Sequence, residues 1–166
     1  MEISEIVDRV AFHQCPIVEV TGGEPLIQKE TPVLVHRLLE EGFEVLMETN
    51  GSQDISGVDK RCVKIVDVKC PSSGEDEKND LRNLTRLSQK DEIKFVIGGR
   101  EDFEYARRIL DLTELRPFRM NPVHFSPVFG KMDLKILAKW ILEDHLDVRL
   151  NQQLHKIIWG PEQAGV

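Results

Sequence analysis

A double glycine at the end of an apolar strand is the feature that most constrains this chain. Residues 18–25 read Val-Glu-Val-Thr-Gly-Gly-Glu-Pro, so a strand-like alternation runs directly into Gly22 and Gly23. Because glycine adopts backbone conformations closed to other residues, the chain turns sharply there. Glu24, held between the turn and Pro25, presents a carboxylate at the strand's carboxyl end, where parallel α/β sheets bind ligands. An ordinary strand-to-helix loop is the alternative for this motif alone.

Beyond that turn, short apolar strands alternate with amphipathic helices. Helical spacing of apolar residues predicts helices over 2–14, 30–41, 81–88, 103–112 and 134–142, and nearly continuous apolar runs predict strands over 17–20, 43–47, 62–68, 93–97, 123–125 and 147–150. This order predicts an α/β fold with a mostly parallel sheet, open or curled into an incomplete TIM-like barrel with the helices outside. No linker is apparent, so residues 1–166 are expected to form one domain, with a mobile loop at 72–80.

The composition argues against several classes of function. The chain has 166 residues, of which 40% are hydrophobic, and a formal net charge of −7. An acidic chain lacks the concentrated Lys and Arg that bind a nucleic-acid backbone. No apolar run is long enough to cross a bilayer, and the first residues lack the pattern of a secretory signal. We therefore expect a cytoplasmic protein without nucleic-acid or membrane partners.

Three cysteines, Cys15, Cys62 and Cys70, lie 47 and 8 residues apart. This spacing fits neither a disulfide framework nor a close set of metal ligands, which favours three free thiols. Cys15 and Cys62 are predicted to be packing residues. Cys70, beside Lys69, is predicted to be partly exposed, with a redox or ligand role as the minority alternative.

Small or polar residues follow most of the predicted strands. They include Glu48 to Ser52, Asp67 to Ser72, Gly98 with Gly99, and Ser126 with Pro127, the last pair predicted to form a turn. In a parallel sheet these ends line one rim, which favours a small-molecule site there over loops of ordinary composition. Lys69 could bind a ligand carboxylate or phosphate, with Asp67 as its structural partner on the same strand face. His155, in a polar run near the C-terminus, stays open between a ligand contact and a surface position.

Taken together, these motifs resemble those of a known family. Residues 21–25 look like the Gly-Gly-Glu-Pro motif of radical S-adenosylmethionine (SAM) enzymes. Further segments resemble the 7-carboxy-7-deazaguanine synthases of queuosine and deazapurine biosynthesis, namely 48–51, 67–74, 94–97, 126–128 and 153–159. The first motif identifies only the superfamily, whereas the segment at 69–74 together with that around His155 is fairly specific. The resemblance runs from about residue 19 to the end.

The resemblance implies a radical ring contraction. In that family a 4Fe-4S cluster cleaves SAM to a 5′-deoxyadenosyl radical, which abstracts hydrogen from 6-carboxy-5,6,7,8-tetrahydropterin, and ammonia is lost with Mg²⁺ assisting. For the methionyl part of SAM, the implied contacts are Gly22, Gly23 and Glu24. For its carboxylate and ribose, they are Asn50, Ser52 and Lys69. For the pterin, they are Thr21, His155 and Pro161.

The sequence departs from the family pattern upstream of residue 18. Radical SAM enzymes hold their cluster by three closely spaced cysteines before the Gly-Gly-Glu-Pro strand, and here only Cys15 precedes it. Because a cluster with one open iron site needs three thiolates, we expect an N-terminally truncated member that lacks the cluster loop and does not turn over alone.

Two other functions stay open, and the truncation also predicts assembly. One alternative is a non-catalytic SAM-binding or scaffold remnant. The other is a small radical SAM enzyme that activates a glycyl-radical protein. Loss of a preceding barrel strand would leave strand 17–20 as an unpaired edge, which predicts a homo-oligomer, most simply a dimer.

Overall fold

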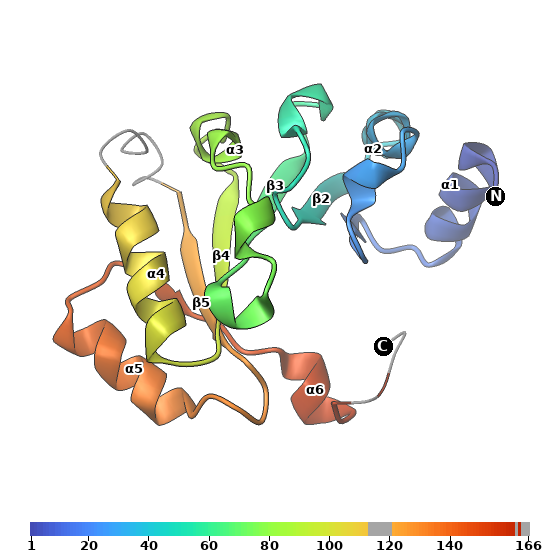
Figure 1. Ribbon diagram of the computed structural model, residues 1–166. Coiled ribbons are helices and arrows are strands. Elements are labelled where there is room, and N and C mark those ends of the chain that lie inside the picture. Colours follow the sequence, from blue (N-terminus) through green and yellow to red (C-terminus); the bar gives the residue numbers. More distant parts are fainter. Residues whose placement is uncertain (113–120, 162, 164–166) are drawn as a thin grey trace.

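The fold is a curved parallel sheet with helices packed on one face. The computed structural model describes residues 1–112, 121–161 and 163. Six strands pair in sequence order, all parallel: β1 (Ile17–Val20), β2 (Glu44–Thr49), β3 (Val63–Val68), β4 (Glu92–Ile97), β5 (Val123–Pro127) and β6 (Arg149–Leu150). Within the described ranges, β1 and β6 each have one neighbour, so the sheet is not closed. The predicted incomplete barrel is confirmed (Figure 1).

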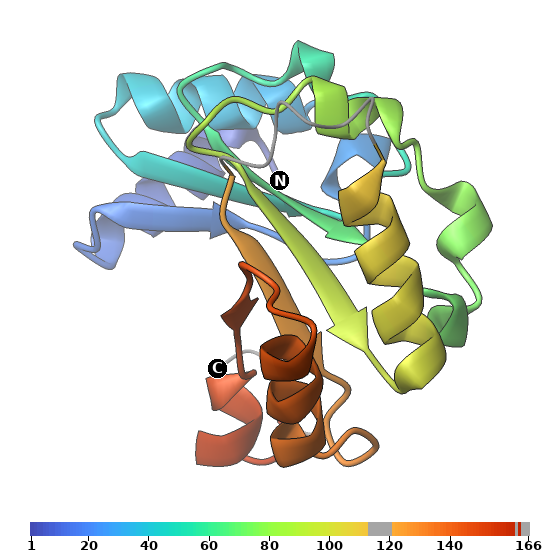
Figure 2. The same ribbon diagram turned by 90° about the vertical axis from the view of Figure 1, so that its left-hand side faces the viewer.

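The helices are α1 (Ile3–Phe12), α2 (Thr31–Glu40), α3 (Arg82–Thr85), α4 (Arg100–Asp111), α5 (Leu134–Glu143) and α6 (Leu154–Ile158). Four of the five predicted helices are confirmed as α1, α2, α4 and α5, with small shifts at their ends. The short helix α6 was not expected. Its apolar residues Leu154, Ile157 and Ile158, and Trp159 just after it, are all exposed. Figure 2 shows α4 and α5 along the strands that they cover.

The third predicted helix, over 81–88, is wrong in extent. It shrinks to the single turn of α3, because Asn83 is fully buried and serves as a clamp. Its Nδ2 donates to the carbonyls of Gly51 at 2.9 Å and Gln53 at 2.8 Å. The predicted loop 72–80 is also tied down, since the Asn79 side chain bonds both the N–H and the C=O of Lys69. These partners are distant in the sequence, so local helix and loop propensities could not predict the contacts.

Three strands differ from expectation by two residues at one end: β2 extends to Thr49 instead of ending at residue 47, and β6 and β5 also differ. The last strand shortens to Arg149–Leu150, whose side chains are exposed. Ser126 and Pro127 belong to β5 rather than to a turn, because they pair in register with Val96 and Ile97. Pairing therefore extended β5 beyond the point where sequence propensity ended it.

The two faces of the sheet differ in chemistry. On β4, Ile93, Phe95 and Ile97 are buried under the helices, while Glu92, Lys94 and Val96 point to the open face. One core cluster packs β3, β4 and β5 against α4 and α5, with edge-to-face contacts of Phe125 to Phe95 and Phe103. A second packs β2 against α1 and α2. The helices thus supply the core, and the open face is left for polar side chains.

The cysteine predictions are partly wrong. Cys62 is buried, as predicted, and burial raises the pKa of its thiol to about 11. Cys15 is exposed, because it follows the end of α1 rather than lying on its buried face. Cys70 is only 2% exposed, since its side chain turns into the core, and burial raises the pKa of its thiol strongly. All three thiols are free, as expected.

No helix in residues 1–112 or 121–161 has the length and apolar character needed to span a membrane. The edge position of β1 is confirmed by its pairing with β2 alone among the described strands. The dimer that this edge predicts stays a prediction.

Candidate functional site

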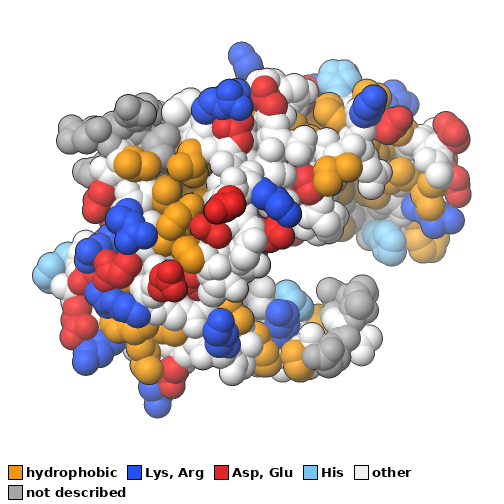
Figure 3. Space-filling view, in the orientation of Figure 1, with side chains coloured by type: hydrophobic (Ala, Val, Ile, Leu, Met, Phe, Trp, Pro, Cys, Tyr) orange, Lys and Arg blue, Asp and Glu red, His pale blue; other side chains and the backbone are white. Residues whose placement is uncertain are grey.

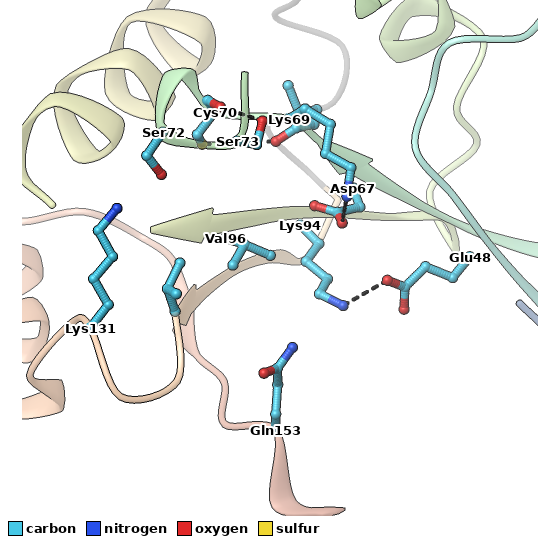
Figure 4. Close-up of a pocket in the computed structure, with 12 residues that line it drawn as sticks. Glu48, Asp67, Lys69, Cys70, Ser72, Ser73, Lys94, Val96, Lys131 and Gln153 are labelled. Carbon is cyan, nitrogen blue, oxygen red and sulfur yellow. Dashed lines mark hydrogen bonds and ion pairs between the residues drawn. The ribbon is translucent and has the colours of Figure 1, made fainter. Parts of the chain in front are cut away.

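Two neighbouring cavities lie over the open face of the sheet. A cavity of about 420 Å³, the smaller cavity, is lined by Glu48, Asp67, Val68, Lys69, Cys70, Ser72, Ser73, Lys94, Val96, Val128, Lys131 and Gln153 (Figure 4). The larger cavity, of about 640 Å³, is lined by Glu19, Thr21, Glu48, Lys94, Ser126, Asn151, Gln152, Gln153, Leu154, His155 and Gln163. Glu48, Lys94 and Gln153 line both. Figure 3 shows the molecule hollowed on this side, between the sheet and the arm that carries α6.

The double-glycine turn has the backbone conformation that the sequence predicts. Gly22 has φ +101° and Gly23 has φ +55°, values that side-chain-bearing residues rarely adopt. A Cβ at either position would meet nothing within 4 Å, so the requirement is conformational rather than steric. Both glycines are exposed, which leaves their main-chain groups accessible at the carboxyl end of β1.

Glu24 is a buried brace between this turn and the end of β2. Only 8% of the residue is exposed. Its carboxylate accepts hydrogen bonds from the Leu26 N–H at 3.0 Å, the Thr49 hydroxyl at 2.8 Å and the Asn50 N–H at 2.7 Å. These partners fix the turn against the next strand. Protein groups thus already engage both carboxylate oxygens, and a contact of Glu24 with SAM stays a prediction.

Asn50 and Ser52 form a turn at the end of β2. The Asn50 side-chain oxygen accepts from the Ser52 N–H at 2.9 Å. Gly51 between them has φ +71°, and a Cβ there would lie 3.0 Å from a Val66 methyl group. In the described structure, neither Asn50 nor Ser52 lines either cavity. The Asn50 N–H donates to Glu24, which links this turn to the glycine turn.

Lys69 lies in the smaller cavity and pairs with Asp67, as predicted. Its ammonium group is 2.6 Å from Asp67 Oδ2. Asp67 is 6% exposed, and its other oxygen, Oδ1, has no hydrogen-bond partner within the described ranges. An ammonium group carries three donors, so Lys69 can hold Asp67 and still bind an anionic ligand group.

Asp102, at the start of α4, organises the neighbouring loop and was missed by sequence reasoning. It is 1% exposed and accepts from the Ser72 N–H at 2.9 Å, the Ser72 hydroxyl at 2.6 Å and the Gly98 N–H at 2.6 Å. A Cβ on Gly98 would lie 2.7 Å from Ser72 Oγ. An acidic residue in the first turn of a helix that follows two glycines was the available signal.

An ion pair joins the two cavities. Lys94 of β4 reaches over β3 to Glu48 of β2, with 2.7 Å between Nζ and Oε1 (Figure 4). From the sequence, Glu48 was expected among the strand-end residues and Lys94 within a strand, without a role for either. Their signal was period-two alternation, which puts charged residues on one face of otherwise apolar strands.

The larger cavity brings together residues from opposite ends of the chain. Thr21 and His155 both line it, and their contact with a pterin stays a prediction. Pro161 is exposed and does not line either cavity in the described structure. Glu19 also faces the larger cavity, and sequence reasoning had not singled it out.

The residues present do not fit a 4Fe-4S cluster or a multidentate magnesium site. One cysteine is exposed and the other two are buried in different core clusters. Across the described residues, no group of three or more His, Cys, Asp or Glu side chains could hold a metal ion. Among the described residues, the site offers polar and charged groups suited to organic ligands.

Comparisons with known proteins decide the family. The chain is 45% identical to the 7-carboxy-7-deazaguanine synthase of Koribacter versatilis over 90% of this chain and 72% of that protein. This chain belongs to the 7-carboxy-7-deazaguanine synthase family. The synthase of Chlorobaculum tepidum is 39% identical over 100% of this chain and 76% of that protein, and that of Methanospirillum hungatei is 36% identical over 97% and 66%. The chain thus spans about two thirds to three quarters of these synthases. No family model matches.

Solved structures agree on the fold. QueE from Escherichia coli superposes with a TM-score of 0.66 at 21% identity, over 92% of this chain and 64% of that one. Streptococcus suis SuiB bound to S-adenosylmethionine gives 0.57 at 11% identity, over 86% and 39%. The synthase family consists of radical SAM lyases, so the resemblance drawn from the motifs is confirmed.

Proposed function

We propose that residues 1–166 supply the SAM- and pterin-binding part of a 7-carboxy-7-deazaguanine synthase. That lyase converts 6-carboxy-5,6,7,8-tetrahydropterin to 7-carboxy-7-deazaguanine in queuosine biosynthesis. The main support is that Thr21 and His155 line one cavity. The two residues belong to family-like motifs at opposite ends of the chain. That cavity shares Glu48 and Lys94 with the cavity that holds Lys69.

The two ligands are assigned to neighbouring sites. The exposed main chain of Gly22 and Gly23, braced by Glu24, takes the methionyl part of SAM. The Lys69 ammonium group takes an anionic or hydroxyl-bearing part, with Asn50 and Ser52 as the further SAM contacts. Thr21 and His155 face the pterin, and Pro161 follows α6 near the same side. When a cluster is supplied, SAM provides the radical chemistry.

The separated thiols support a second part of the proposal. Cys62 and Cys70 are buried with raised pKa values, so both are poor sources of the thiolate that iron requires. We infer that residues 1–166 bind the organic ligands without assembling a 4Fe-4S cluster, and that cluster and Mg²⁺ ligands must come from elsewhere. We also propose that the protein is cytoplasmic and assembles as a homodimer.

Ligand binding and cluster loading test the two parts separately. Calorimetry should detect binding of SAM and of 6-carboxypterin, a stable oxidised analogue of the substrate. Iron and sulfide measured after anaerobic reconstitution should stay well below one cluster per chain. Failure to bind both ligands would leave the scaffold remnant as the better description, and a stoichiometric cluster would refute the second part. Binding of SAM without the pterin would favour an activating enzyme instead.

A further inference from the structure

We propose that Glu19 is a specificity-determining residue of this site. Glu19 and Ser126 accept hydrogen bonds from an amino-bearing edge of the ligand. The inference rests on the proposed function and adds contacts that none of the motif residues supplies. The ligand edge in question is the 2-amino-4-oxopyrimidine ring of the pterin, which carries several N–H donors.

Strand register places Glu19 on the wall of the larger cavity. Glu19 of β1 pairs with Leu46 of β2, so its side chain shares the open face with Leu46 and Glu48. Glu19 and Glu48 are diagonal neighbours on adjacent strands, close enough for their side chains to interact. Both line the larger cavity, together with Thr21 and His155.

The charges on this wall do not balance. Lys94 is the one Lys or Arg among the described residues that line the larger cavity, and its ammonium group already bonds Glu48 at 2.7 Å. Two carboxylates therefore face one cation. A ligand that presents hydrogen-bond donors or positive charge would offset the excess negative charge of these carboxylates, whereas a ligand that presents acceptors would be repelled.

Ser126 provides an independent indication of a ligand. It is 0% exposed and lines the same cavity, yet its hydroxyl oxygen has no hydrogen-bond partner in residues 1–112 or 121–161. Buried polar groups are nearly always paired in proteins. A donor-bearing ligand in the larger cavity would satisfy this oxygen as well as the Glu19 carboxylate.

The titration of Glu19 supports the same role. Glu19 is an exposed residue, but partial desolvation of its carboxylate and the negative charge of Glu48 raise its pKa, and Lys94 partly offsets them. The other titratable group on this cavity is His155, and the adjoining cavity adds Asp67, Lys69, Cys70 and Lys131. Ionisation of Glu19 is therefore less favourable here than in free solution. A donor ligand would recover that free energy on binding.

A pair of ligands that differ at one position tests the contact. 6-Carboxypterin has a 2-amino group, and 6-carboxylumazine has an oxygen there, which turns a donor into an acceptor. Calorimetry on the whole chain should show that the wild type prefers the pterin. Glu19→Gln exchanges a charge-assisted hydrogen bond for a neutral one, so this preference should fall roughly tenfold. Ser126→Ala should weaken pterin binding by a smaller factor.

Glu44→Gln is the matched control. It makes the same change on the neighbouring strand, at an exposed position that lines neither cavity. It should leave the preference unchanged. A second readout separates ligand recognition from a structural role: because the folded state raises the pKa of Glu19, its ionisation opposes folding. Glu19→Gln should therefore raise the unfolding midpoint at pH 7 and lose this advantage well below pH 4.5.

Each other outcome has a definite meaning. Equal affinity of the wild type for both ligands, or an unchanged preference in Glu19→Gln, would overturn the inference and leave the proposed function standing. Absence of both pterin and SAM binding in the wild type would reject the proposed function and this inference with it. A shift of the Glu19 carboxyl NMR signal on adding Mg²⁺ alone would make the two carboxylates a cation site and overturn the inference.

Discussion

At the scale of single residues, buried carboxylates fix the positions of the loops around the site. Glu24 ties the double-glycine turn to β2. Asp102 ties the loop after β3 to the end of β4. Each carboxylate satisfies several N–H or hydroxyl donors that would otherwise be buried without partners. The positions of the accessible groups around the cavities therefore depend on residues that do not face a ligand.

Glu24→Gln tests this bracing role. The amide places an N–H₂ group among donors, so at least one buried contact is lost. We expect the free energy of unfolding to fall by about 1–3 kcal/mol, measured by urea denaturation. The exposed Glu30→Gln is the control and should change little. Equal midpoints for Glu24→Gln and wild type would show that the brace is dispensable.

At the scale of elements, glycines decide where loops can approach each other. Gly98→Ala would put a methyl group 2.7 Å from Ser72 Oγ and 3.0 Å from Asp102 Oδ2, which breaks the contact between the loop after β3 and α4. We expect a loss of about 1–3 kcal/mol in stability and weaker SAM binding at the smaller cavity. Gly99→Ala is the control, because a Cβ there meets nothing within 4 Å. Similar effects of the two variants would contradict the steric explanation.

The short helix α3 acts as a clamp on the loop after β2. Asn83→Ala would leave the Gly51 and Gln53 carbonyls and the Ile55 N–H without this partner. Unfolding in urea should show a loss of about 2–4 kcal/mol for these buried groups together. Thr85→Ala, which removes an exposed bond within the same turn, should cost much less. A loss no larger than that of the control would mean that the loop is held by other contacts.

At the scale of the whole molecule, the open sheet leaves an edge and a net acidic charge. β1 exposes Ile17 on that edge, where 51% of the residue is accessible. Sedimentation should show a dimer, and Ile17→Lys should shift it toward monomer, because a charge on an edge strand disfavours pairing. Glu2→Lys introduces a lysine, with an even larger change in charge, away from β1 and should leave the dimer intact. A wild-type protein that is strictly monomeric would refute assembly through this edge.

Stability should fall in acid because several carboxylates are held ionised. Hydrogen bonds from Arg61 hold the pKa of Asp59 and of Glu40 below their ordinary values, and Arg82 does the same for Asp80. A depressed pKa contributes stability above the unfolded value and loses it as the pH falls through the folded value. Unfolding midpoints should therefore decline below about pH 4.5, and Asp59→Asn should flatten that decline. The effect is modest, since these pairs are exposed and screened.

The class of fold and the chemistry of the main turn follow from local sequence patterns. Alternating strand and helix patterns fix a parallel sheet, because parallel strands need crossover helices. Gly22 and Gly23 were predictable because a positive φ is a local property of glycine. Family membership also followed from short motifs, and the more similar relatives confirm it.

Which side chains meet depends on the three-dimensional arrangement of the strands. Thr21 and His155 share a cavity, and Glu48 pairs with Lys94, because sheet register and curvature bring distant strands together. Cys70 turned inward and Asn83 ended its helix early for the same reason. Local propensity contains no information about partners that lie tens of residues away. Glu19 is the clearest case: one strand residue among others in sequence, it becomes part of a binding wall once β1 pairs with β2.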